Sequence, residues 1–312
     1  MSNLPIFVGL DYHQDSIQVC VLNSQGEVLM NRSASNNCLE LVERLGWNVS
    51  LGHPTYIARM KNSPDKSDFS DGRLIADLTR VGYLPRVWLA PGYIRELRQL
   101  VNHRQRLVSH ATSLKLQVGA VLREQRVKIG SDRGGRWSRA WTASVKDNSA
   151  LSEQGRWVVN DLLDQLAHGQ GRIKSVEARL AEVRENDAVV KRLMNQPGIG
   201  QVTAWVLRAC IGRFDRFKTG KQLARYCGMS PRNASSGERI SDAGLIDACN
   251  PMLRATVVQA AHRWIRTIPR WAKLAGHLKR CGKPPCVAVA AVGNRWLRGL
   301  HHVMKGSVSD HN

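Results

Sequence analysis

The chain has 312 residues and a formal net charge of +21, from 46 lysines and arginines against 25 acidic residues. That length accommodates two domains, and so large a positive charge favours a polyanionic partner, so nucleic acid is the leading prediction. A ribosomal or other structural role, or a basic surface without a specific partner, is the alternative. The chain lacks a run of roughly 20 apolar residues and a signal-peptide pattern, so we expect a cytoplasmic protein with no membrane partner.

The seven cysteines are scattered, and none of them forms a C-x-x-C pair, which is typical of a protein in a reducing compartment. Cys281 and Cys286 precede two histidines, His301 and His302, and could be drawn as a zinc site. Their spacing is unusual for zinc, however, and the Pro-Pro between them predicts a plain turn. We therefore do not predict a zinc centre.

The first third of the chain predicts an α/β domain over residues 1–91. It opens with three strands in an antiparallel meander, because apolar and polar residues alternate and a Ser-Gln-Gly turn separates the second strand from the third. Helical and extended patterns then follow one another. The predicted segments are the meander at 5–35, a helix at 38–46, the strand WNVSLGHP, a helix at 66–82 and the strand LPRVWLAP.

The middle third, residues 92–194, predicts two long helices joined by the basic link GSDRGGRWSRAW. The second helix, at about 150–194, has apolar residues at spacings of three and four, which is a coiled-coil seam. The seam over 166–190 either pairs two chains or closes a hairpin within one chain. The basic outer faces fit a nucleic-acid backbone, and an ordinary solvated helix surface is the alternative. The seam residues are Ile173, Val176, Leu180 and Val183.

The last third, residues 195–312, predicts an all-α domain. It begins with Pro197-Gly198-Ile199-Gly200, a tight turn before a helix whose glycines would let backbone N–H groups approach a phosphate. Any corner between helices could use the same turn. A polar loop, NASSGERISDAG, precedes helices at about 250–267 and 286–305.

Three aspartates form the candidate site. Asp11 follows an apolar strand, where a carboxylate is costly unless a positive charge compensates it. Asp68 and Asp71 are three residues apart at the start of a helix, so they share a face. The alternative for this pair is helix N-capping, which explains one aspartate but not both. Metal-dependent phosphoryl transfer requires carboxylates from a strand and from a helix in one place. We therefore predict that Asp11, Asp68 and Asp71 bind Mg²⁺.

These motifs resemble those of transposases of the insertion-sequence 110 group, DNA recombinases with a RuvC-like domain of the RNase H fold. VGLDYHQDSIQV resembles the opening strand of that domain, and KSDFSDGRL resembles the motif that carries its last two acids. The most specific match is residues 197–232, which lead into Ser235-Ser236-Gly237. The resemblance implies an N-terminal RuvC-like domain, a helical hairpin or coiled coil, and an all-α transposase domain.

The same resemblance implies a mechanism and partners. Asp11, Asp68 and Asp71 would hold Mg²⁺, and the serine next to the glycine, Ser236, would attack the DNA backbone, with Ser235 as the alternative. Acids and serine would meet between protomers of a homo-oligomer, and a non-coding guide RNA would direct the reaction. Arg232, Arg239 and Arg254 could steady a phosphate, or be ordinary surface arginines.

One family feature is missing from the sequence. The family carries a glutamate on a strand between its first aspartate and its aspartate pair, and this strand is absent here; the nearest candidates, Glu40 and Glu43, belong to the surface of the predicted helix. Loss of a central strand would leave sheet edges unpaired. Two further hypotheses therefore stand beside a metal-dependent transposase: a nucleic-acid-binding relative that cannot cut, and a hydrolytic junction nuclease that uses only the acidic site.

Overall fold

A computed structural model describes residues 5–35, 49–61, 67–128, 135–233 and 242–305 of the chain. Contacts divide the chain into two compact units, Met1–Ala90 and Pro91–Asn312, each of which is described by itself. Among the described helices, none combines the length and the apolar character needed to cross a membrane.

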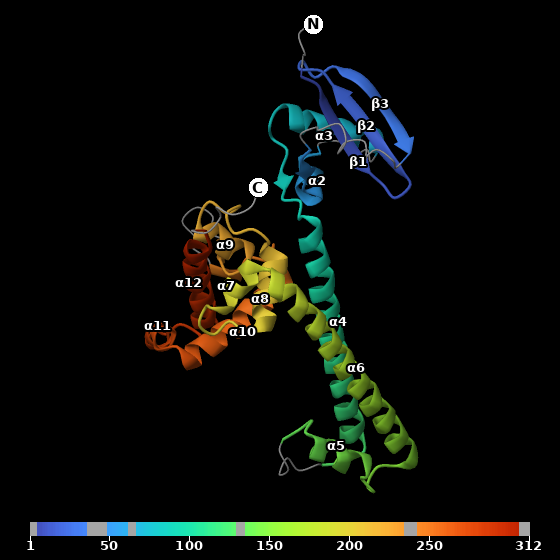
Figure 1. Cartoon of the computed structure of the whole chain (residues 1–312), viewed down its shortest axis with the longest axis vertical. Helices are drawn as coiled ribbons and strands as arrows, with labels where there is room; N and C mark the ends of the chain where they lie inside the picture. The colour runs from blue at the N-terminus through green and yellow to red at the C-terminus, as the bar shows by residue number, and fades with distance from the viewer. Residues whose placement is uncertain (1–4, 36–48, 62–66, 129–134, 234–241, 306–312) are drawn as a thin grey trace. The chain divides into compact units, whose positions relative to one another are not determined.

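The first unit opens with the predicted meander, which is confirmed. Strands β1 (Phe7–Tyr12), β2 (Ser16–Leu22) and β3 (Val28–Ser35) form an antiparallel sheet in the order β1-β2-β3. Figure 1 shows this sheet with helix α3 (Asp68–Arg80), which confirms the predicted helix at 66–82, lying against it. Among the described residues of this unit, Cys20, Leu22 and Ala76 form one buried cluster.

The glycine at position 9 allows α3 to approach the sheet closely. A Cβ atom added at Gly9 would lie 2.2 Å from the carbonyl oxygen of Gly72 and 2.5 Å from the backbone nitrogen of Ala76. Because these neighbours are backbone atoms of a helix, they cannot move aside as a flexible side chain could. The glycine at position 9 therefore sets the distance between β1 and α3.

The remaining elements of the first unit are short. Strands β4 (Leu51–Gly52) and β5 (Arg86–Val87) pair with each other, within the segments predicted as strands. Helix α2 (Pro54–Met60) was not predicted, although proline at its first position is a common helix start. The predicted helix at 38–46 lies outside the described residues.

The second unit begins with the predicted helical hairpin. Helices α4 (Gly92–Glu124) and α6 (Glu153–Asn186) lie side by side, and the short helix α5 (Arg139–Lys146), which was not predicted, packs on α6 near the tip (Figure 1). Residues of the predicted seam face α4 of the same chain: Leu180 is fully buried in one cluster with Leu97 and Val101. The seam therefore closes a hairpin within one chain. The side chain of Val183, the last predicted seam residue, lies outside the described residues.

The second predicted helix is divided in two. Helix α6 ends at Asn186, and α7 (Ala188–Met194) starts after Asp187, whose carboxylate accepts hydrogen bonds from the backbone nitrogens of Val189 and Val190. The other oxygen of Asp187 lies 2.6 Å from Nε of Arg208, in an ion pair that is almost buried. An aspartate cap held by a buried arginine therefore separates the hairpin from the helices that follow.

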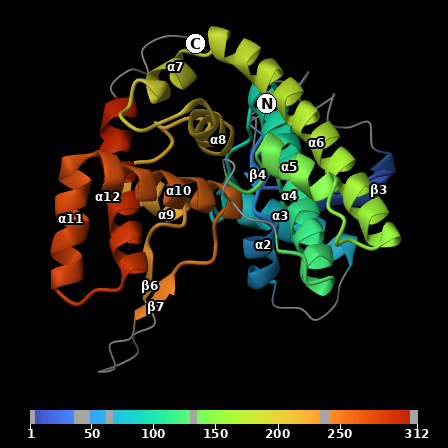
Figure 2. The ribbon, with the colours of Figure 1, turned by 90° about the horizontal axis from the view of Figure 1, so that it is seen from below.

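In the described residues after α7, five more helices follow, and α10, α11 and α12 pack on one another (Figure 2). Their core contains large aromatic side chains, with the rings of Trp264 and Trp296 stacked at 4.2 Å between centroids. Burial raises the pKa of the Cys210 thiol in the same core to about 11. The helices are α8 (Gln201–Ile211), α9 (Gly220–Tyr226), α10 (Pro251–Thr267), α11 (Pro269–Arg280) and α12 (Pro285–Lys305).

The prediction of an all-α domain over 195–312 needs one correction. Strands β6 (Pro231–Asn233) and β7 (Asp242–Leu245) pair antiparallel, with Pro231 opposite Leu245. Residues predicted as a polar loop thus contribute backbone hydrogen-bonding groups to a short ladder. Runs this short, without alternating apolar residues, carry little strand signal in the sequence.

Candidate metal centre

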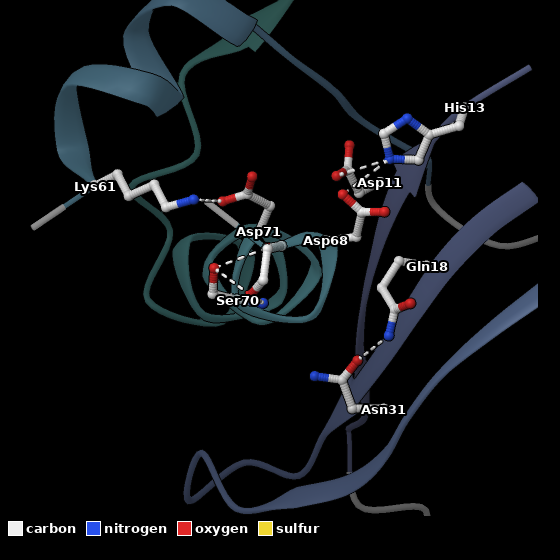
Figure 3. A network of polar contacts seen from close by, with 9 residues as sticks. Asp11, His13, Gln18, Asn31, Lys61, Asp68, Ser70 and Asp71 are labelled. Carbon is white, nitrogen blue, oxygen red and sulfur yellow. Dashed lines mark hydrogen bonds and ion pairs between the residues drawn. The ribbon is translucent and has the colours of Figure 1, made fainter. Parts of the chain in front are cut away.

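Three side chains gather where β1 ends and α3 begins. Nε2 of His13 lies 3.4 Å from a carboxylate oxygen of Asp11 and 3.4 Å from one of Asp68. Each residue offers one ligand atom, and the three atoms lie within 4.8 Å of one another. Figure 3 shows the imidazole pointing toward the two carboxylates, which come from a strand and a helix far apart in the sequence.

Local structure explains how each side chain reaches this place. Asp11 is the penultimate residue of β1, and the backbone nitrogen of His13 bonds to the carbonyl oxygen of Ser16 at 2.9 Å, which turns the chain into β2. Asp68 is the first residue of α3. The cap of this helix is Ser67, whose hydroxyl accepts a hydrogen bond from the nitrogen of Ser70, so neither Asp68 nor Asp71 acts as the N-cap.

Asp71 has a different partner from the other two predicted acids. Its carboxylate lies 2.5 Å from Nζ of Lys61, and both side chains are largely buried, with 30% and 17% of their surfaces exposed. Asp71 is not a member of the group formed by Asp11, His13 and Asp68. The structure thus brings Asp11 and Asp68 together and pairs Asp71 with a lysine.

A cleft of about 1250 Å³ runs beside the site in the first unit. Its wall includes Phe7 and Val8, then Leu10 and Asp11, which are successive residues of β1. Since successive strand residues point to opposite faces, a cleft that touches them in turn follows the edge of the strand. Within the described residues, β1 pairs with β2 alone, so this edge has no strand partner there.

The candidate glutamates cannot be placed beside this edge. Glu40 and Glu43 lie outside the described residues, as do Ser235, Ser236 and Arg239. Of the predicted arginines that the structure describes, Arg232 lies near Asp247, at 3.6 Å between charged atoms. Arg254 donates to the carbonyl oxygen of Ile246, just after β7, and so supports the base of this ladder.

Sequence reasoning missed His13 and Lys61. His13 stands two residues after Asp11, and residues at this spacing in extended chain point to the same side, which is a signal that could have found it. Lys61 is ten residues from Asp71 in a segment without regular periodicity, so nothing in the sequence marks it. Two carboxylates and an imidazole are a donor set suited to a divalent cation, and a cation held there could neutralise a phosphate.

Two family models match the chain. Residues 190–275 match the model described as "Transposase IS116/IS110/IS902 family", and residues 39–126 match a transposase model named for the DEDD acids of IS110 elements. The second match includes Asp68 and Asp71 but begins after Asp11.

Curated relatives point the same way. The chain is 22% identical over 284 residues to the transposase for insertion sequence element IS1111A of Coxiella burnetii, covering 84% of this chain and 78% of the relative. It is 25% identical over 272 residues to a probable family 20 transposase of Pseudomonas aeruginosa, covering 83% and 78%. It is 27% identical over 225 residues to a putative transposase of Sinorhizobium fredii, covering 71% of this chain and 54% of that protein. The chain therefore carries transposase domains of the IS110/IS116/IS902 family in both halves, at 39–126 and 190–275.

Proposed function

We propose that this chain cuts and rejoins DNA strands during transposition of an insertion sequence, using Mg²⁺ and a serine nucleophile. The observation that carries the proposal is the convergence of Asp11 and Asp68, from β1 and α3, on one point. Carboxylates from two such elements are what a site for phosphoryl transfer needs, and the family of the matched domains supports DNA as the substrate. The RuvC-like fold of the first domain, and the division into 1–91, 92–194 and 195–312, belong to this proposal.

The donor set fits a hard divalent cation. Ligands about 2.1 Å from an octahedral ion lie about 3 Å apart when adjacent, and the spacing of 3.4 Å between Nε2 of His13 and an oxygen of each aspartate is close to that value. A bound Mg²⁺ would neutralise phosphate oxygens and so favour displacement at phosphorus. Asp11 and Asp68 would hold it, and the close contact between β1 and α3 would keep the two carboxylates near each other.

The second chemical group is the serine. In the proposal, Oγ of Ser236 bonds to phosphorus while a deoxyribose oxygen leaves and takes up a proton, so the bond energy of the phosphodiester is kept in a phosphoserine link until strands exchange. Ser235 is the alternative nucleophile. A homo-oligomer and a guide RNA complete the proposal, and the net charge of +21 suits both nucleic acids.

Strand cleavage on supercoiled DNA that carries the ends of the element tests this function. Asp11→Asn should slow cleavage on the order of 10²-fold or more, because it removes several kcal/mol of charge stabilisation. Ser236→Ala should abolish the covalent protein–DNA product seen on a denaturing gel. Asp77→Asn is the matched control, since Asp77 lies on α3 but pairs with Arg80.

The outcomes separate the competing functions. Loss of cleavage in both variants supports the transposase. Loss in Asp11→Asn with full cleavage in both Ser236→Ala and Ser235→Ala contradicts the serine mechanism and identifies a hydrolytic nuclease. A parent protein that binds DNA without cutting it contradicts both enzymes and leaves a nucleic-acid-binding relative, a reading that the missing glutamate strand favours.

A further inference from the structure

Two side-chain amides connect the sheet to the first turn of α3. Nε2 of Gln18, on β2, donates a hydrogen bond to Oδ1 of Asn31, on β3, at 2.6 Å (Figure 3). Nδ2 of Asn31 in turn donates to the backbone carbonyl oxygen of Phe69 at 3.0 Å. We call Gln18, Asn31 and this carbonyl group the amide relay. Because Phe69 directly follows Asp68, the relay ends one residue away from a predicted metal ligand.

The amide relay begins opposite the other carboxylate. In the register of β1 and β2, Gln18 is the partner of Asp11. Side chains of directly opposed residues lie on the same face of a sheet, so Gln18 and Asp11 share a face. Helix α3 covers Gln18 there, since a Cβ atom added at Gly72 would lie 3.2 Å from Cγ of Gln18. The relay therefore extends from the strand position opposite Asp11 to the residue after Asp68.

Burial makes the amide relay specific for one arrangement of helix and sheet. Only 8% of Gln18 is exposed, and a buried amide is costly unless its polar atoms have partners. Apolar contacts are not directional, whereas two hydrogen bonds in series constrain both distance and direction. Ligands of a functional site must be held to within about 0.5 Å, so a constraint on the first turn of α3 is also a constraint on Asp68.

The far end of α3 has a polar contact of its own. Arg80, in the last turn of this 13-residue helix, pairs with Asp77 and donates to the carbonyl oxygen of Ser24 at 3.3 Å. Ser24 lies in the turn between β2 and β3. Both ends of the helix are thus bonded to the same pair of strands. Since Arg80 lies at the end away from Asp68, it offers a control for the amide relay.

We propose that Gln18 and Asn31 are positioning residues of the candidate metal centre, which hold the first turn of α3, and with it Asp68, in place relative to Asp11. The inference rests on the proposed function, because the proposed reaction uses these two carboxylates. Neither amide contacts the cation or the DNA. Both act through the backbone of α3, so their loss weakens metal binding although every ligand remains.

Titration of the full chain with Mn²⁺, in the absence of DNA, tests the proposal. Mn²⁺ is the probe because electron paramagnetic resonance reports its binding. Asn31→Leu keeps the size of the side chain and removes its hydrogen bonds, so it should weaken Mn²⁺ binding about tenfold or more, the scale found for groups that orient metal ligands. The control Arg80→Met should bind Mn²⁺ as the parent does. Circular dichroism checks that each variant is folded.

A double-mutant cycle separates a relay from two independent contacts. Gln18→Met should also weaken Mn²⁺ binding, but less than Asn31→Leu, because Asn31 keeps its bond to Phe69. Adding Gln18→Met to Asn31→Leu should cause little further loss, since the series of bonds is already broken. Losses that multiply in the double variant would overturn the proposal, and so would parental Mn²⁺ affinity in either single variant.

The Mg²⁺ dependence of DNA cleavage adds a measurement that distinguishes positioning from loss of folded protein. Asn31→Leu should raise the Mg²⁺ concentration needed for half-maximal cleavage, and saturating Mg²⁺ should restore the parental rate. A variant that is only less folded would cut more slowly at every Mg²⁺ concentration. A lower maximal rate with an unchanged half-saturating concentration would therefore contradict the positioning role.

The proposed function and the amide relay can fail separately. Mn²⁺ binding with the expected variant effects, in a chain that does not cut DNA, would sink the proposed function and leave the relay intact. Cleavage that requires Asp11, with a Mg²⁺ dependence that Asn31→Leu leaves unaltered, would do the reverse. A parent chain that neither binds Mn²⁺ nor cuts DNA would overturn both.

Discussion

The two units of the chain are held together in different ways. In the second unit, large side chains fill the core, including Trp205 and Trp264, which are almost fully buried. In the first unit, the buried cluster under α3 consists of Cys20, Leu22 and Ala76, and contact between helix and strand depends on the absence of a side chain at Gly9. The difference teaches that the candidate metal site lies on the unit whose described buried cluster is the smaller. There, adding volume is the sensitive change, whereas in the helical unit removing volume is the sensitive change.

The largest expected effect is in the helical core. Trp264→Ala should destabilise the second unit by about 3–5 kcal/mol, because it leaves a large cavity beside Trp296. Hydrogen exchange measured by mass spectrometry should show faster exchange in α8, α10 and α12. Exchange in β1, β2 and α3 should stay unchanged, and Mn²⁺ should still bind. Equal loss of protection in both units would contradict the difference drawn between them.

An intermediate effect is expected from adding one carbon atom to the first unit. Gly9→Ala should cost about 1–3 kcal/mol or more, since the new Cβ would meet backbone atoms of α3. Separation of α3 from β1 also moves Asp68 away from Asp11. Mn²⁺ affinity should therefore fall although no ligand has changed, while exchange in the helical unit stays the same. Unaltered affinity would show that this close contact does not set the site.

The smallest effect is expected on the hairpin, where Gly171 lies exposed within α6. An added Cβ would meet no atom within 4 Å, so Gly171→Ala should stabilise the helix by about 0.8–1 kcal/mol through its higher helix propensity. Slower hydrogen exchange of the backbone amides in α6 would report this stabilisation. The variant is also the control for Gly9→Ala, because the same chemical substitution has the opposite sign. Destabilisation here would mean that the hairpin is packed against something that the described contacts do not include.

Much of the fold follows from local sequence patterns. The meander has alternating residues and a Gly-containing turn, and the long helices have apolar periodicity over many turns, so both were predicted and found. Helices α2, α5, α9 and α11 were not predicted. The first three are short, and α2 and α11 begin with proline, Pro54 and Pro269, a residue that is also typical of turns. The break before α7 depends on Asp187 and its partner Arg208, which are brought together only by tertiary packing.

The candidate site could also be predicted only in part from the sequence. Asp11 and Asp68 could be selected as acids at the ends of predicted elements, and they do lie together. Their spatial relation to His13 and the pairing of Asp71 with Lys61 depend on how closely α3 approaches β1. The glycine at position 9 permits this close approach, but a glycine in the sequence does not by itself predict it. The serine and its neighbours, at 234–241, stay predictions.

Pulsed electron paramagnetic resonance of Mn²⁺ bound to the full chain is the most direct test of the central claim, that a strand-borne and a helix-borne carboxylate share one cation with His13. The account predicts electron spin echo modulation from one directly coordinated ¹⁴N nucleus, which disappears in His13→Asn and persists in Asp71→Asn. A spectrum with oxygen ligands and water protons alone, identical in the parent and in His13→Asn, would contradict it.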